Sequence, residues 1–147
     1  MKTSSGIYYV SAQKGNDKND GSAHHPFATL FAVNRLPLKP GEQVLLERGS
    51  VFLGQFLHLS VQGTKEAPIL IGAYGEGNPP EIAARGQGIW YQDYGTELDS
   101  PTHTKEGYVS SAVLLYDCAY VTLRDIAVSN QGKIVGETYE APRKMNR

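Results

Sequence analysis

The chain has 147 residues and a formal net charge of −1, with 40% hydrophobic and 20% charged residues. This length predicts a single domain, and the balanced charge shows no basic surface for nucleic acid or anionic membranes. The single cysteine excludes an internal disulfide, and no apolar run reaches the roughly 20 residues of a membrane-spanning helix. The 16 glycines and 9 tyrosines favour a β-rich globular protein over a helical or disordered one.

The first predicted elements are a strand, a polar loop and a short helix. Aromatic and β-branched residues over 7–10 predict the strand. Residues 15–22 are rich in glycine, asparagine and aspartate, which predicts a loop. The helix is expected from Pro26 to Arg35, because proline suits a first helical turn and a mostly apolar stripe follows at helical spacing.

Further strands are expected in segments bounded by glycine, proline or serine, namely residues 43–47, 55–61, 69–74, 81–84, 112–116, 120–123 and 125–130. The continuous apolar run at 69–71 indicates a strand buried on both faces, as in parallel sheets. The sequence predicts no helices between these strands. An Asp-Gly pair is typical of a tight hairpin between antiparallel strands, but Asp20-Gly21 precedes a helix rather than joining two strands. The all-β rhythm of short strands therefore favours a parallel β-helix, a solenoid of stacked coils. In this arrangement His58, between Leu57 and Leu59, is expected to face solvent.

Residues 85–111 have little periodicity and are predicted to form a long loop, which is usually a functional feature. Its rings at Trp90, Tyr91, Tyr94 and Tyr108 suit the C–H faces of sugars, and nearby carboxylates suit sugar hydroxyls. The candidate substrate-binding residues are Trp90, Tyr91, Asp93, Tyr94 and His103. The other interpretation is that these aromatic residues cover the flank of the solenoid.

The run Asp17–Gly21 offers carboxylate and amide oxygens on one turn, the ligands that calcium prefers. The twelfth position from Asp17 is Ala28, where a calcium loop needs a bidentate glutamate. Asx-turns that stabilise the entry to the helix are the alternative. No other metal site or cofactor is expected.

Four segments carry a resemblance to a known family: Tyr9 to Ser22, Pro26-Phe27-Ala28-Thr29-Leu30, Pro40 to Gly75, and Tyr120-Val121-Thr122-Leu123-Arg124-Asp125-Ile126 ending in Asn130. They resemble the N-terminal region of right-handed parallel β-helix proteins of the pectate lyase-like superfamily. The resemblance implies a capping helix within residues 7–42 and first coils over residues 43–130. The aromatic loop at 85–111 is then an insertion, and the chain is expected to be the front part of a longer protein.

The resemblance also implies a function. It suggests the N-terminal portion of a carbohydrate-active enzyme, a glycoside hydrolase or polysaccharide lyase acting on a polysaccharide or oligosaccharide. Catalytic groups of the family lie in later coils, so no catalytic residue is assigned and the chain alone is expected to be inactive. The alternative is a non-catalytic carbohydrate-binding or adhesive protein.

Location and partners follow from the same reasoning. The resemblance implies a secreted or cell-surface protein, although the first residues lack the apolar core of a signal peptide, which leaves the cytoplasm open. Neither nucleic acid nor a membrane is an expected partner. Self-association is expected, because a last coil would present unpaired strand edges and an apolar stack.

Overall fold

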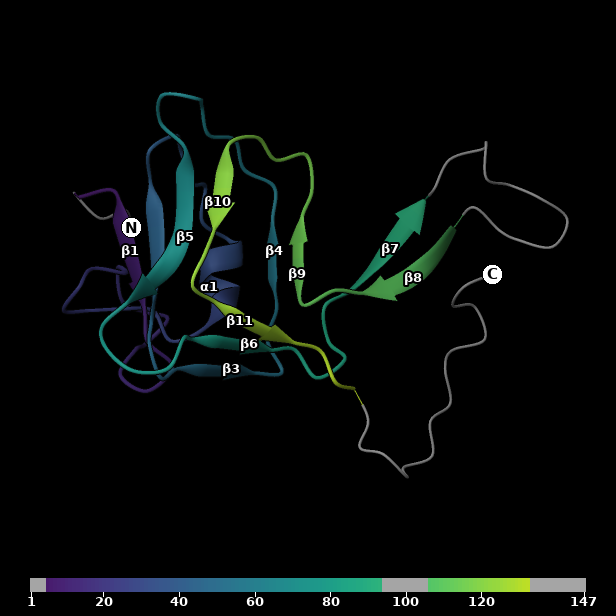
Figure 1. The fold of residues 1–147 in the computed structure, drawn as a ribbon, viewed down its shortest axis with the longest axis horizontal. Coiled ribbons are helices and arrows are strands. Elements are labelled where there is room, and N and C mark those ends of the chain that lie inside the picture. Colours follow the sequence, from purple (N-terminus) through teal and green to yellow (C-terminus); the bar gives the residue numbers. More distant parts are fainter. Residues whose placement is uncertain (1–4, 94–105, 133–147) are drawn as a thin grey trace, which may run out of the picture.

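The computed structural model describes residues 5–93 and 106–132 (Figure 1). Most of the regular structure is short strands, with a single five-residue helix among these residues. In chain order the elements are β1 (Ile7–Val10), α1 (Leu30–Asn34), β2 (Gln43–Glu47), β3 (Val51–Leu53), β4 (Leu57–Leu59), β5 (Ile69–Tyr74), β6 (Glu81–Ala83), β7 (Ile89–Asp93), β8 (Glu106–Ser110), β9 (Val113–Leu115), β10 (Val121–Leu123) and β11 (Ala127–Ser129).

The described strands form four small sheets. The largest has the order β1-β2-β5-β10, and all its neighbours are parallel. A second sheet, β11-β6-β3, and a strand pair, β4-β9, are also parallel. The fourth sheet is the antiparallel pair β7-β8, which projects from the side of the other three (Figure 1).

The prediction of a right-handed parallel β-helix with the architecture of the pectate lyase-like superfamily is wrong. The strands are divided among separate small sheets, one of which is antiparallel, and they do not build a solenoid. The helix is also too short to act as the expected cap. Regularly spaced short apolar runs predicted most strands, but local periodicity does not encode which strands pair or in which direction. Only the bounds of the predicted segments, residues 7–42, 43–130 and 85–111, stay predictions.

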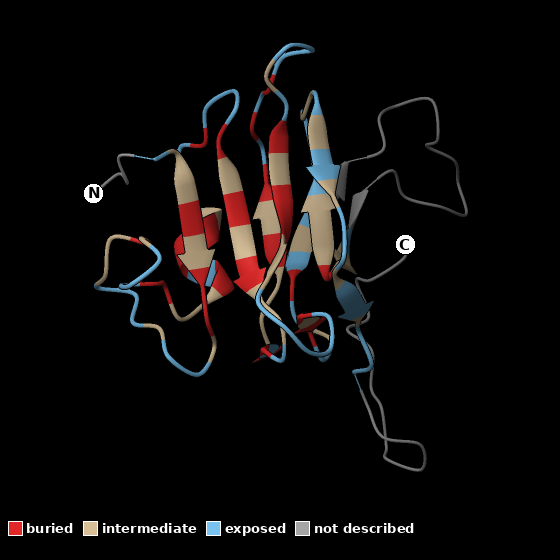
Figure 2. Cartoon of the chain, turned by 60° about the vertical axis from the view of Figure 1, so that its left-hand side comes forward, coloured by how far each residue is buried: buried red, intermediate tan, exposed pale blue. Residues whose placement is uncertain are grey.

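The core lies between the sheets and α1. Alternate residues of β1, β2 and β5 point inward and stack in register, as in the row formed by Tyr8, Val44 and Ile71. Phe52 of β3 and Ile82 of β6 close the core from the second sheet. Buried residues gather in the earlier strands and become fewer toward the later ones (Figure 2). Burial of apolar area in these rows is the main stabilising contribution.

The helix begins later than predicted. Phe27 forms a parallel bridge with Val10, and its backbone N–H and C=O are bonded to Tyr9 and Ser11. A residue paired in this way cannot also form a first helical turn, so α1 begins only after the extended residue Thr29. Among the described residues, no helix is long and apolar enough to span a bilayer.

The predicted strand boundaries are mostly confirmed, with one omission and one error. The ranges 7–10, 43–47 and 69–74 coincide with β1, β2 and β5. The short strand β3 is not predicted, because three residues between two glycine-containing turns give too little periodicity. The long loop at 85–111 instead contains β7 and β8 at its two ends, so that prediction is wrong there.

The loop before α1 is held by the carboxylate of Asp17, whose Oδ1 accepts hydrogen bonds from the backbone N–H groups of Ala28 and Thr29. We predict that Asp17→Ala lowers the free energy of unfolding by about 1–2 kcal/mol, the usual cost of losing hydrogen bonds to a charged group. Urea denaturation measures this change. The neighbouring exposed Lys18→Ala should stay within about 0.5 kcal/mol of the unmodified chain. Equal effects of the two substitutions would contradict this role of Asp17.

Tyr74 on β5 lies edge-on to the ring of Tyr9, with ring centroids 5.1 Å apart. Burial, then the negative charge of Glu47, then Tyr9 raise the pKa of Tyr74 to about 12. Because the pKa of Tyr74 is higher in the folded than in the unfolded chain, its neutral hydroxyl favours the folded state. This stabilisation is complete below pH 10 and is lost as the pH rises toward about 12. An alkaline titration of phenolate absorbance should therefore show a late step that is absent from Tyr74→Phe. An unchanged titration in Tyr74→Phe would contradict this prediction.

The outer strands β9, β10 and β11 each pair along one edge only, within the part of the chain that the structure describes. Their core-side residues are only partly covered; Val128 is 49% exposed, whereas Ile82, its partner in register, is fully buried. We predict concentration-dependent self-association through these edges, measured by sedimentation velocity. Val121→Lys, which puts a charge among the apolar rows, should reduce it more than the outward-facing Thr122→Lys. A monomer at every concentration would contradict the prediction.

Candidate functional site

The β7-β8 hairpin carries an exposed pair of tyrosines. Tyr91 lies directly opposite Tyr108 in the antiparallel register, so both side chains lie on the same face. Their rings are 5.1 Å apart at an interplanar angle of 64°, and the residues are 51% and 45% exposed. A protruding pair of aromatic rings with hydroxyl groups suits a ligand that has both C–H faces and polar groups.

Trp90 has a different role from its neighbour. Successive strand residues alternate between faces, so the Trp90 side chain points away from the tyrosine pair. Its Nε1–H donates a hydrogen bond to Ser111 Oγ at 3.0 Å, and the residue is partly buried. This contact fixes the hairpin against the start of the segment that leads to β9.

The imidazole of His58 also contacts Ser111, the residue that follows β8. His58 Nε2 lies 2.8 Å from the carbonyl oxygen of Ser111, and because a carbonyl only accepts, Nε2 carries the donated proton. The ring also packs against Phe56, with centroids 4.5 Å apart. The sequence-based expectation that His58 simply faces solvent is therefore wrong; a hydrogen-bond partner 53 residues away leaves no local pattern.

Gly88 is required at the base of the hairpin. Its φ is +77°, a region that glycine tolerates, and a Cβ placed there would lie 2.2 Å from the Ser111 carbonyl oxygen. The backbone N–H of Ser111 in turn donates to the carbonyl of Gly88 at 3.0 Å. A side chain at this position would push the hairpin away from His58.

Asn130 ties the hairpin to the segment that follows β11. Its Oδ1 accepts a hydrogen bond from the backbone N–H of Gly86 at 2.8 Å, and its Nδ2 donates to Ser110 Oγ at 3.1 Å. Ser110 Oγ itself donates to the carbonyl of Gln87 at 2.7 Å. These bonds orient β7 and β8 relative to the β11-β6-β3 sheet.

The five predicted site residues have different outcomes. Trp90 and Tyr91 lie next to each other on β7 but on opposite faces. The backbone of Asp93 ends β7, while its side chain is outside the described structure. Tyr94 and His103 also lie outside the described residues. Tyr108 belongs with Tyr91, although only its aromatic character marked it in the sequence.

The carboxylates of the N-terminal half hold structural hydrogen bonds. Glu47 accepts from Ser11 Oγ at 2.6 Å and lies 3.3 Å from Lys14 Nζ, while Glu42 accepts from the backbone of Lys39. Asp20 accepts from the backbone N–H of Ser22, and this hydrogen bond lowers the pKa of its carboxyl group.

The described residues hold no group of three or more histidine, cysteine, aspartate or glutamate side chains suited to a metal ion. Asp17 and Asp20 of the proposed calcium loop bond to backbone N–H groups. The bond of Asp20 to Ser22 is the contact of an Asx-turn, whereas Asp17 reaches the entry of α1 across the loop. The calcium site stays a prediction.

The known proteins that this chain resembles in sequence and in structure are lacto-N-biosidases. No family model matches the chain. A lacto-N-biosidase of Bifidobacterium longum subsp. longum is 40% identical over 137 residues, which is 87% of this chain and 8% of that protein. The GH136 lacto-N-biosidase of Eubacterium ramulus, solved as native protein and as a selenomethionine derivative, is 66% identical with a TM-score of 0.85. The match covers 96% of this chain and 23% of the solved one, so the chain is similar to a limited part of these larger proteins.

Proposed function

We propose that this chain forms part of a glycoside hydrolase that acts on an oligosaccharide. The observation that carries the proposal is the 66% identity, with a TM-score of 0.85, to the solved lacto-N-biosidase over 96% of the chain. At such identity the backbone and most side chains of this region are shared. The name lacto-N-biosidase denotes a glycosidase, so the comparisons support hydrolysis and give no support to the predicted polysaccharide lyase.

We infer that catalysis uses groups outside residues 5–93 and 106–132. Hydrolysis of a glycosidic bond uses two carboxyl groups on opposite sides of that bond, one as acid and one as base or nucleophile. In the described structure Glu42 and Glu47 serve as hydrogen-bond acceptors for the chain itself. The chain also spans 8% of the curated relative and 23% of the solved one. We infer that the chain alone does not turn over substrate.

The contribution of this region is binding. Tyr91 and Tyr108 present adjacent exposed rings on one face of a hairpin whose base is fixed by His58, Ser111 and Asn130. A rigid base reduces the entropy lost when a ligand is bound. The C–H face of a sugar ring would pack on the tyrosine rings, while its hydroxyl groups would bond to the phenol oxygens.

A chimera tests the function and the hairpin together. The matching segment of the E. ramulus enzyme would be replaced by this chain, and hydrolysis of a chromogenic lacto-N-bioside would be measured. We expect the chimera to retain activity and the double variant Tyr91→Ala, Tyr108→Ala to raise KM about three- to tenfold, as expected for lost aromatic contacts.

Two controls accompany this experiment. Tyr116→Ala removes a tyrosine with the same 51% exposure as Tyr91, outside the hairpin, and should leave KM unchanged. The chain alone should give no turnover. An inactive chimera that still binds the substrate would favour the alternative, a carbohydrate-binding or adhesive protein. An unchanged KM in the double variant would show that the hairpin does not bind the substrate. A secreted or cell-surface location stays a prediction.

A further inference from the structure

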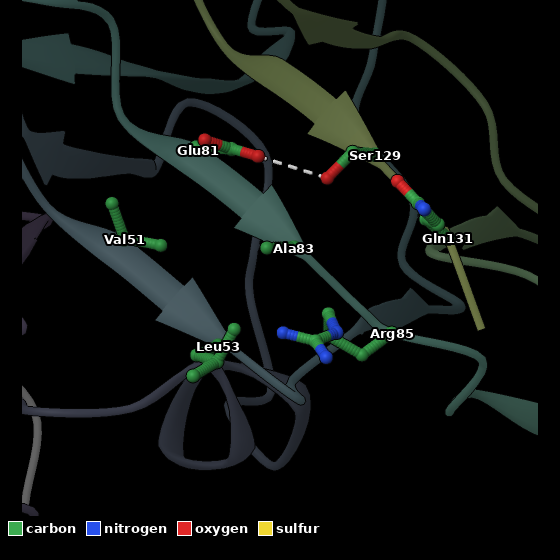
Figure 3. Close-up of a pocket in the computed structure, with 7 residues that line it drawn as sticks. All are labelled: Val51, Leu53, Glu81, Ala83, Arg85, Ser129 and Gln131. Atoms are coloured by element: carbon green, nitrogen blue, oxygen red, sulfur yellow. Dashed lines mark hydrogen bonds between the residues drawn. The ribbon is translucent and has the colours of Figure 1, made fainter. Parts of the chain in front are cut away.

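The outward face of the β11-β6-β3 sheet is hollowed into a pocket of about 370 Å³ (Figure 3). The parallel register places its wall residues in rows across the strands, and one row runs from Leu53 through Ala83 to Ser129. The alanine in the middle of this row has only a methyl group, so it forms a floor between longer side chains. The volume is within the range of about 300–1,000 Å³ typical of small-molecule sites.

One side of the pocket is aliphatic and accessible. Val51 and Leu53 alternate with the buried Phe52 along β3, so both point outward, and they are 51% and 60% exposed. Adjacent exposed aliphatic side chains of this kind are unfavourable in water unless a ligand or another surface covers them. They form a wall suited to the C–H surface of a ligand.

The other side carries two opposite charges. Glu81 accepts a hydrogen bond from Ser129 Oγ at 2.8 Å through Oε2, which orients the carboxylate and leaves Oε1 as an acceptor. The guanidinium of Arg85 turns back over the sheet toward Leu53 (Figure 3). No ion pair or hydrogen bond engages that guanidinium within residues 5–93 and 106–132. The pocket thus offers a donor and an acceptor with no net charge.

The backbone of Arg85 has a left-handed conformation. Arg85 and Gly86 both have positive φ, +55° and +82°, and the N–H of Gly86 is held by Asn130 Oδ1. A non-glycine residue in this conformation costs energy, and such strain is often found at binding sites. Asn130 also bonds to Ser110 of the hairpin, so one side chain orients both the rim of the pocket and the base of the tyrosine pair.

We propose that this pocket is a second carbohydrate subsite, one that takes a neutral sugar unit of the oligosaccharide; this inference rests on the proposed function. A neutral sugar has hydroxyl groups that accept from Arg85 and donate to Glu81, and a C–H face that packs on Val51 and Leu53. The opposite charges of Glu81 and Arg85 cancel, so the pocket gives no net electrostatic attraction to an anionic or a cationic ligand.

The test uses the 147-residue chain, labelled with ¹⁵N and titrated with galactose, N-acetylglucosamine or galacturonate in a heteronuclear NMR experiment. We expect the two neutral sugars to shift the amide signals of residues 81–86 and 128–131 in a saturable manner. Arg85→Ala should weaken this binding about tenfold, the effect of losing a hydrogen bond to a charged group. Leu53→Ser should weaken it as well, and because Leu53 is outside the core this variant keeps the fold.

Arg124→Ala is the matched control, since it removes another exposed guanidinium, on the β10 side of the molecule, and should not change sugar binding. Tighter binding of galacturonate than of galactose would overturn the proposal of a neutral ligand. Shifts at Tyr91 and Tyr108 without shifts at the pocket would overturn the second subsite and leave the proposed function intact. Absence of saturable shifts at the pocket would also overturn it, while activity of the chimera reports separately on the proposed function.

Discussion

The fold depends on strand β5, which is hydrogen-bonded along both edges. It pairs with β2 through five residue pairs and with β10 through three, and its core-side residues Ile69 and Ile71 are fully buried. Each strand is too short to be stable alone, because an isolated pair buries little apolar surface. Pairing in register lets Val44, Ile71 and Leu123 extend one apolar row across three strands, and the remaining sheets pack around such rows.

The hairpin and the second sheet are joined by polar contacts rather than by this core. Trp90, His58 and Asn130 all direct hydrogen bonds to the segment Ser110–Ser111 at the foot of β8. The bonds of Trp90 and His58 are partly buried, and they define orientation because a buried donor or acceptor left without a partner is costly, whereas the bond of Asn130 is exposed. The tyrosine pair is therefore presented from a fixed base, although it lies away from the main core.

The sequence contained enough information for most strands but not for their assembly. The ranges of β1, β2 and β5 follow from apolar alternation between glycine- and proline-containing turns. The sheet partners, such as Glu81 of β6 with Ala127 of β11, are separated by dozens of residues, and no local pattern encodes them. The same limit applies to the candidate site. Aromatic content identified Tyr91, but its pairing with Tyr108 needed the antiparallel register. Likewise, the contact of His58 with Ser111 needed the three-dimensional structure.

The decline in burial from β1 to β11 also bears on how the molecule opens. Local unfolding begins where apolar contacts are fewest, so β11 belongs to the least protected part of the described structure, whereas β5 opens only with the whole fold. Ser129, whose hydroxyl donates to Glu81, belongs to this weakly held segment. A ligand that binds only when the segment is closed would use part of its binding energy to order it. Binding of a ligand to the pocket on the β11-β6-β3 sheet and ordering of β11 are then thermodynamically coupled.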